Sequence, residues 1–120
     1  MNKKTLIIGA SDNPERYSFK AANSLHSHGH EVVLLGKRNG IVIGQEIIKD
    51  RPIVENVDTV TLYINPTHQQ EWYAYIISLK PKRVVFNPGT ENPEFEKLLT
   101  QNNIEPLEAC TLVMLSIGNY

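Results

Sequence analysis

Small, polar and basic residues follow the first apolar run of this chain. Leu6-Ile7-Ile8 breaks at Gly9-Ala10-Ser11, and the turn residues Asn13-Pro14 then lead into a segment with helical spacing. In a parallel α/β sheet such a loop leaves the carboxyl end of its strand. There the free N–H groups of the next helix's first turn favour an anion. The chemistry predicted by this stretch is phosphate binding.

Comparable loops follow the other predicted strands. Their sequences are Gly36-Lys37-Arg38, Asn65-Pro66-Thr67 and Asn87-Pro88-Gly89. Because ligands of open α/β sheets bind outside the carboxyl ends of the strands, we expect these loops to share one rim. Lys37, Arg38 and Arg16 bring positive charge to it, whereas Lys3-Lys4 and Lys82-Arg83 precede their strands and are expected at the opposite edge. The rim is therefore predicted to be selectively basic.

The type of nucleotide follows from what this loop lacks. The dinucleotide fingerprint has three glycines and an acidic residue about 20 residues further on, which holds the ribose. This chain has Gly9 alone, and its second strand ends in Gly36-Lys37-Arg38 rather than in an acid. Cations at that position suit a phosphorylated ribose, so coenzyme A or NADP fits better than NAD.

Hydrophobic periodicity predicts the elements that position these loops. The strands are expected at residues 4–8, 31–35, 58–64, 83–86 and 104–108. Helices are expected at 18–28 and 67–79, and from 93 onward, with Ser18, Thr67 and Asn92 as N-caps. Residues 111–117 could form a terminal helix or a buried segment. For residues 41–53 we predict mostly loop, with a short strand or turn near 41–43.

The alternation of strands and helices predicts an α/β fold. We expect a Rossmann-like, doubly wound parallel sheet of about five strands between two helical layers, with the first strand central. The 120 residues, without repeats or shifts in composition, predict one domain spanning 1–120.

Bulk composition excludes several partners. The net charge is −1 and no Lys/Arg cluster exceeds two adjacent residues, which argues against nucleic acid. No apolar run approaches the roughly 20 residues of a membrane span. The single cysteine, Cys110, fits a reducing compartment. We therefore expect a cytoplasmic protein without nucleic-acid or membrane binding.

The ordered set of motifs resembles the small CoA-binding domain family. That family is similar to the N-terminal domain of the succinyl-CoA synthetase α subunit, and the match covers essentially the whole chain. The residues that carry it are Gly9-Ala10-Ser11 with Pro14, Arg16, Tyr17 and Ser18, then His28-Gly29-His30-Glu31-Val32, Gly44, Asp58, Asn87-Pro88-Gly89 and Cys110. The resemblance implies a Rossmann-like domain that binds CoA.

The resemblance also implies roles for individual residues. Gly9, Ala10 and Ser11 would contact the CoA phosphates, Lys37 would pair with a phosphate, and the loops Asn65-Pro66 and Asn87-Pro88-Gly89 would line the rest of the cofactor's path. Arg16, Tyr17 and Ser18 complete the expected binding site. After the second strand many relatives have an Asn-Pro or Pro-rich turn, where this chain has Gly36-Lys37-Arg38. The synthetase's later domain with its phosphorylated histidine has no counterpart here, so ligase chemistry is not implied.

Residues that suggest catalysis or metal binding have simpler explanations. His26, His28 and His30 would not share one face of a helix, and histidines at a helix C-terminus are favoured by its dipole, so no metal site is predicted. We interpret Cys110 as a buried structural thiol, with exchange with the CoA thiol as the alternative. No close carboxylate pair is evident for acid–base work. We therefore expect no catalytic residues.

Three functions stay open at this point. The first is binding of CoA or acyl-CoA without catalysis by this chain. The second is an NADP-linked enzyme or redox sensor that uses the same loop. The third is a regulatory or interaction module that binds no nucleotide. A phosphoacceptor receiver domain is disfavoured because the first strand ends in Ile8-Gly9-Ala10 rather than in acids, and the apolar tail up to Tyr120 could support a homodimer or bind another protein.

Overall fold

The computed structural model describes residues 2–120 and contains one five-stranded parallel sheet in the order β2-β1-β5-β6-β7. The strands are β1 (Thr5–Ile8), β2 (Val32–Leu35), β5 (Thr59–Leu62), β6 (Arg83–Phe86) and β7 (Glu105–Glu108). The predicted Rossmann-like α/β fold is confirmed. The first strand, however, is not central: β1 is second from one edge and β5 holds the middle, because the chain returns after β2 to the far side of β1.

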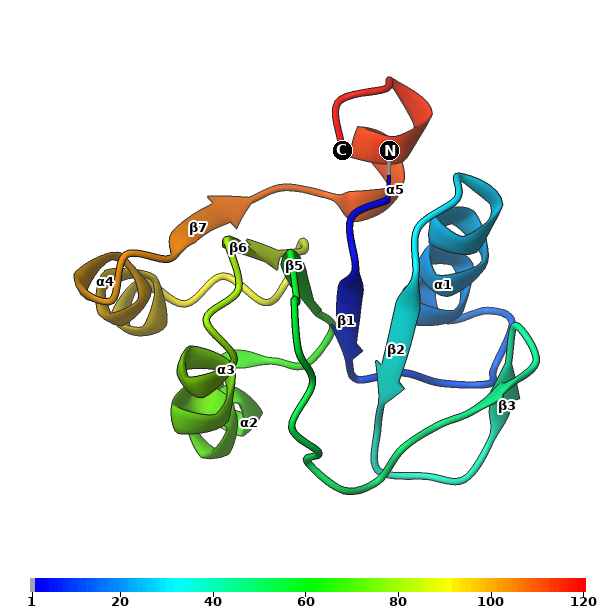
Figure 1. Ribbon diagram of the computed structural model, residues 1–120, viewed down its shortest axis with the longest axis horizontal. Helices are drawn as coiled ribbons and strands as arrows, with labels where there is room; N and C mark the ends of the chain where they lie inside the picture. The colour runs from blue at the N-terminus through cyan, green and yellow to red at the C-terminus, as the bar shows by residue number, and fades with distance from the viewer. Residues whose placement is uncertain (1) are drawn as a thin grey trace.

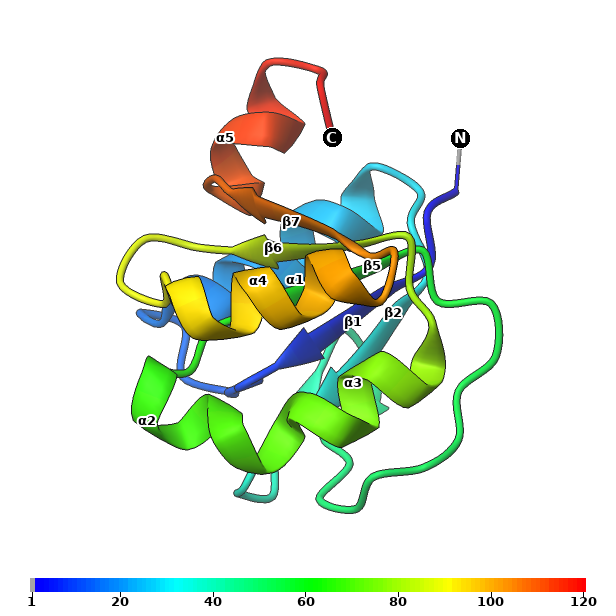
Figure 2. The ribbon, with the colours of Figure 1, turned by 90° about the vertical axis from the view of Figure 1, so that its left-hand side faces the viewer.

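Helices cover both faces of this sheet, as Figures 1 and 2 show. One face carries α1 (Tyr17–Ser27) and α5 (Thr111–Ser116). The other carries α2 (Pro66–Gln69), the short 3₁₀ turn η1 (Gln70–Trp72), α3 (Tyr73–Leu79) and α4 (Pro93–Gln101). Residues 111–117, left open by the sequence, are thus mainly helical. None of the helices within residues 2–120 has the length and apolarity that a membrane crossing needs.

Side chains alternate between two hydrophobic clusters along each strand. In β1, Leu6 and Ile8 pack with the α3 and α4 side chains, whereas Ile7 packs with α1 and α5. Phe86 and Phe95 fill the first cluster and are fully buried. Burying such a side chain contributes about 1.5–3 kcal/mol, so the sheet holds its carboxyl-end loops on a rigid base.

The helix N-termini differ in how they are capped. Asn92 caps α4 as predicted, its side chain accepting from the backbone N–H of Phe95. The cap of the α2 segment is Asn65 rather than Thr67, because Pro66 already occupies the first helical position. In α1 the N-cap is Arg16, and Ser18 lies buried inside the first turn. The prediction of Ser18 as N-cap was wrong.

Residues 41–48 are more ordered than predicted. β3 (Ile41–Val42) and β4 (Gln45–Glu46) form an antiparallel hairpin whose turn residues, Ile43 and Gly44, both have positive φ. Ile48 then pairs with Leu35 at the free edge of β2. The short strand near 41–43 is confirmed. The expected loop beyond it was wrong at these positions, since the pairing depends on a distant strand that local periodicity does not reveal.

The amino edge of the sheet holds Tyr120. Its hydroxyl bonds with Thr5, and Lys3 and Arg83 donate to its main-chain oxygen. The Arg83 guanidinium lies 4.5 Å from the ring centroid, and the His30 ring lies 5.0 Å away. This aromatic residue is therefore used inside the chain, while Val113 and Ile117 of the α5 segment stay exposed. A homodimer stays a prediction.

Candidate functional site

The loop between β1 and α1 rests on the end of β2. The N–H groups of Gly9 and Ala10 both donate to the Leu35 carbonyl, at 3.0 and 2.9 Å. Gly9 has a φ of +95°, and a Cβ added there would lie 3.1 Å from the backbone of Tyr63 at the end of β5. The loop backbone is therefore held between two strand ends in a conformation that strongly favours glycine.

Short local bonds shape the middle of this loop. The Ser11 hydroxyl accepts from the Asn13 N–H at 3.1 Å, and the Asn13 side chain accepts from Glu15 at 3.0 Å. The Asn13 carbonyl accepts from Arg16, also at 3.0 Å. These bonds give the loop a preformed shape before any ligand arrives.

Five backbone N–H groups in this region have no hydrogen-bond partner within residues 2–120. They belong to Ser11 and Asp12 in the loop and to the first turn of α1, namely Tyr17, Ser18 and Phe19. No side chain caps α1, in contrast to α2 and α4. First-turn donors together with the helix dipole favour a negative group. The free donors thus lie slightly further along the chain than Gly9 and Ala10.

The basic turn after β2 lies against the same loop. Lys37 and Arg38 are exposed, and the glycines on either side of the turn approach the β1–α1 loop closely. A Cβ added to Gly36 would lie 2.6 Å from the Ala10 carbonyl oxygen, and one added to Gly40 would lie 2.9 Å from Asp12. The predicted proximity of the two loops is therefore present in the structure.

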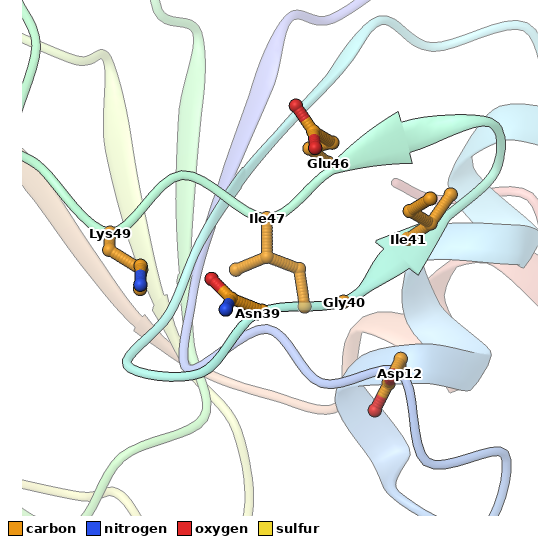
Figure 3. A pocket seen from close by; sticks show the side chains of 7 residues that line it. All are labelled: Asp12, Asn39, Gly40, Ile41, Glu46, Ile47 and Lys49. Carbon is orange, nitrogen blue, oxygen red and sulfur yellow. The ribbon is translucent and has the colours of Figure 1, made fainter.

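A hollow of about 810 Å³ opens along the seam between these loops and the β3–β4 hairpin (Figure 3). Ile41 and Ile47 supply apolar surface, while Asp12, Glu46 and Lys49 supply charge. The full lining is Asp12, Asn39, Gly40, Ile41, Glu46, Ile47 and Lys49. The sequence analysis did not predict that the β3–β4 hairpin lines this hollow. The available signal was the pair of glycines, Gly36 and Gly40, that flank the basic turn.

The remaining predicted loops follow β5 and β6. Asn65 uses its side chain to cap α2, and Asn87 is buried with its side-chain nitrogen and oxygen both hydrogen-bonded inside the protein. The Asn87 amide donates to the Thr61 hydroxyl and the Leu62 carbonyl, and its oxygen accepts from Thr111. Asn87 therefore ties the strand ends to α5 rather than presenting a side chain at the rim. Pro88 and Gly89 beside it are exposed.

Cys110 and Tyr63 lie behind the rim. Cys110 lies at the N-cap of α5 and is half-buried rather than buried as predicted. The Tyr63 hydroxyl is buried near Thr61 and Thr111 without completing a hydrogen bond within residues 2–120. Burial raises the pKa of this phenol, so it stays protonated across the physiological range.

The carboxyl groups of Glu96 and Glu108 and the histidine side chains bear on acid–base chemistry and metal binding. Burial, and then the neighbouring carboxyl group of Glu108, raise the pKa of Glu96. Their contact joins α4 to β7, a tertiary pairing without a local signature. His30 packs on Tyr120, and no group of three potential metal ligands occurs within residues 2–120.

Comparisons with known proteins bear on the fold and the family of this chain. A crystal structure described only as that of an uncharacterized protein shares 57% identity, covers 100% of this chain and 99% of its own, and superposes with a TM-score of 0.98. A hypothetical protein from Pyrococcus horikoshii OT3 has 24% identity, coverages of 96% and 82%, and a TM-score of 0.87. A Thermus thermophilus protein called cell-free ID.343 has 22% identity, coverages of 98% and 91%, and a TM-score of 0.86. The last two show the shared fold alone.

No curated protein matches the chain. A family model does, and it is the one described as a CoA binding domain, over residues 3–116. That range includes every loop at the carboxyl rim and both helical layers. The chain therefore belongs to the CoA binding domain family.

Proposed function

We propose that this chain binds coenzyme A or an acyl-CoA at the carboxyl rim of its sheet, without catalysis of its own. The observation that carries the proposal is the set of unpartnered N–H groups at Ser11, Asp12 and the uncapped start of α1. These donors lie in a chain of the CoA binding domain family. We treat residues 1–120 as one binding domain.

The donors and the nearby cations suit a polyphosphorylated ligand. Backbone N–H groups at a helix start bind phosphate through hydrogen bonds and the helix dipole. Lys37 and Arg38, with Arg16 at the α1 N-cap, add charge-assisted bonds, which are about twice as strong as neutral ones. Gly9 and Ala10 contribute shape, since their N–H groups already bond to Leu35.

Other parts of the rim would contact the rest of the ligand. Tyr17 and Ile41 are 67% and 65% exposed, and offer apolar surface on either side of the phosphate loop. Asn65-Pro66 and Pro88-Gly89 continue the rim at the ends of β5 and β6. We assign Asn87 a supporting role there, because it holds Thr61 and Thr111 together from within.

The role that we propose for the rim residues is binding rather than reaction. The single cysteine supports a cytoplasmic location.

Isothermal titration calorimetry with CoA, acetyl-CoA, NADP and NAD tests this function. We expect binding of CoA or acetyl-CoA, and a thermal shift that grows with ligand concentration. Binding of NADP alone would instead favour the redox alternative, and no binding would favour an interaction module.

A charge variant locates the site. Lys37→Ala should weaken CoA binding about tenfold, equivalent to about 1.4 kcal/mol. Lys82→Ala is the control, because Lys82 is also exposed but precedes β6 at the opposite edge. Equal effects of the two substitutions would contradict the proposed site.

A further inference from the structure

Two glycines in the turn after β2 are required by space rather than by backbone conformation. Gly36 and Gly40 lie outside the left-handed region, so alanine is compatible with their φ values. A Cβ at Gly36 would nonetheless lie 2.6 Å from the Ala10 carbonyl oxygen and 3.0 Å from Ile47. A Cβ at Gly40 would lie 2.9 Å from both Cβ and Cγ of Asp12. At distances of 2.6 and 2.9 Å one of the two contacting groups must shift.

These two close approaches lie at opposite ends of the exposed segment Lys37-Arg38-Asn39. One end meets Ala10 at the start of the β1–α1 loop, and the other meets Asp12 two residues further on. The first end is also fixed from outside, because the Gly36 N–H donates to the Ile48 carbonyl at 3.1 Å. The second is fixed by Ile47, whose N–H donates to the Gly40 carbonyl at 2.9 Å. The basic turn is thus held at both ends on the loop with free donors.

We propose that Gly36 and Gly40 are positioning residues that seat the Lys37-Arg38 turn on the β1–α1 loop, so that one phosphate site is assembled from both. This inference rests on the proposed function and adds how its two halves are aligned. The Asp12 carboxylate is part of this phosphate site. Packed over Gly40, it lines the hollow of Figure 3, and a displaced Asp12 would change the negative charge beside the phosphate donors.

The two glycines are expected to differ in their response to alanine. At Gly36 the obstacle is a backbone carbonyl, so the new methyl group must move the chain and will reduce stability as well as binding. At Gly40 the obstacle is the Cβ and Cγ of Asp12, an exposed loop residue, so Asp12 must move together with its short stretch of exposed loop. Gly40→Ala therefore separates alignment from folding better than Gly36→Ala does.

Calorimetry of CoA binding to Gly40→Ala, Asp12→Gly and the double variant tests the inference. We expect Gly40→Ala to raise the Kd about tenfold, because a misplaced binding group loses much of its contribution. The unfolding midpoint should stay close to that of the parent. Removing the Asp12 side chain removes the obstacle, so the double variant should bind within about twofold of Asp12→Gly alone, which is a coupling rather than a sum.

Gly29→Ala is the control for the Kd and not for stability. A Cβ there meets nothing within 4 Å and Gly29 follows α1 at the opposite edge, but its φ of +84° strains an alanine. This substitution should leave the Kd unchanged. Wild-type CoA affinity in Gly40→Ala, or additive losses in the double variant, would overturn the inference.

A second measurement keeps the inference separate from the proposed function. Amide hydrogen exchange at Gly9 and Ala10, whose N–H groups bond to the Leu35 carbonyl, needs no ligand. It should quicken in Gly40→Ala and return in the double variant to the rate of Asp12→Gly. If the parent protein does not bind CoA, the proposed function is wrong. The positioning role of Gly40 is refuted separately, by unchanged amide exchange in Gly40→Ala.

Discussion

At the scale of single residues, the site depends on positions where only one side chain fits. Gly9 combines a φ of +95° with close approaches to Tyr63 and Ile64 at the end of β5. Asn87 joins β5, β6 and α5 through three buried hydrogen bonds. Both residues lie directly below the rim, so their effect on binding passes through the shape of the loops.

Gly9→Ala should therefore cost more than a glycine substitution at which only the left-handed φ opposes alanine. A left-handed φ alone costs about 1–2 kcal/mol for alanine, and the clash with the Tyr63 backbone adds to it. Gly29→Ala is the matched comparison, with a φ of +84° and open space around the added Cβ. Urea unfolding of both variants measures the difference, and equal losses would show that the clash relaxes freely.

Replacing Asn87 by Ala should lower the free energy of unfolding by about 2–4 kcal/mol, because buried partners lose their bonds at once. The Thr111 N–H and the Leu62 carbonyl would be left unsatisfied. Denaturant midpoints give the loss. Asn23→Ala, which removes an exposed bond to Phe19, is the control and should change stability little.

At the scale of elements, the two longest described helices, α1 and α4, begin differently. The α4 start has Asn92 as a cap and acids in its first turn, whereas α1 has neither. An uncapped start is less stable by about 1 kcal/mol. The gain is a set of donors that a ligand can use, so stability and binding are opposed at this helix.

Arg16→Asn tests whether stability and CoA binding are opposed at the start of α1. The Arg16 backbone, with φ −79° and ψ 141°, already suits an N-cap, so an asparagine side chain should raise the free energy of unfolding by about 0.5–1 kcal/mol. It should also weaken CoA binding, because it occupies a first-turn N–H. Arg16→Gln removes the same charge without capping, and it should weaken binding without stabilising. If Arg16→Asn left both quantities unchanged, the donors would not be available to a ligand.

At the scale of the whole molecule, the two ends of the described chain meet at the amino edge of the sheet, away from the rim. The His30 Nδ1 accepts from the Lys3 N–H at 2.9 Å, and its ring packs on Tyr120. Burial, together with nearby positive charges that include His28, Lys3 and Arg83, lowers the pKa of His30 below its usual 6.5. Neutral His30 is thus part of the folded arrangement.

Acid should therefore weaken the fold through His30. Above pH 6.5 the ring is neutral in both folded and unfolded chains, so its contribution is fully present. Below pH 6.5 the unfolded chain takes up a proton that the folded chain resists, and stability falls until the lowered folded pKa is passed. Urea midpoints across this range should fall less in His30→Asn, whose amide keeps an acceptor but does not titrate. Parallel curves would contradict this role.

The sequence by itself determined the fold class, because strand and helix periodicities alternate and each loop has its own turn residues. It also determined that the small and basic residues meet at one rim, since parallel strands bring their carboxyl ends together. The chain's membership in the CoA binding domain family was predicted from the ordered motifs in the same way. These features are local or follow from topology alone.

Only the tertiary structure decided which atoms are free. Gly9 and Ala10 use their N–H groups on Leu35, Asn87 turns inward, and the available donors belong to Ser11, Asp12 and the start of α1. The sequence also did not predict the strand order, the pairing of the hairpin at 41–46 or the contacts of Gly36 and Gly40. The physical reason is that hydrogen bonds and close approaches between distant segments depend on packing, which local periodicity does not encode.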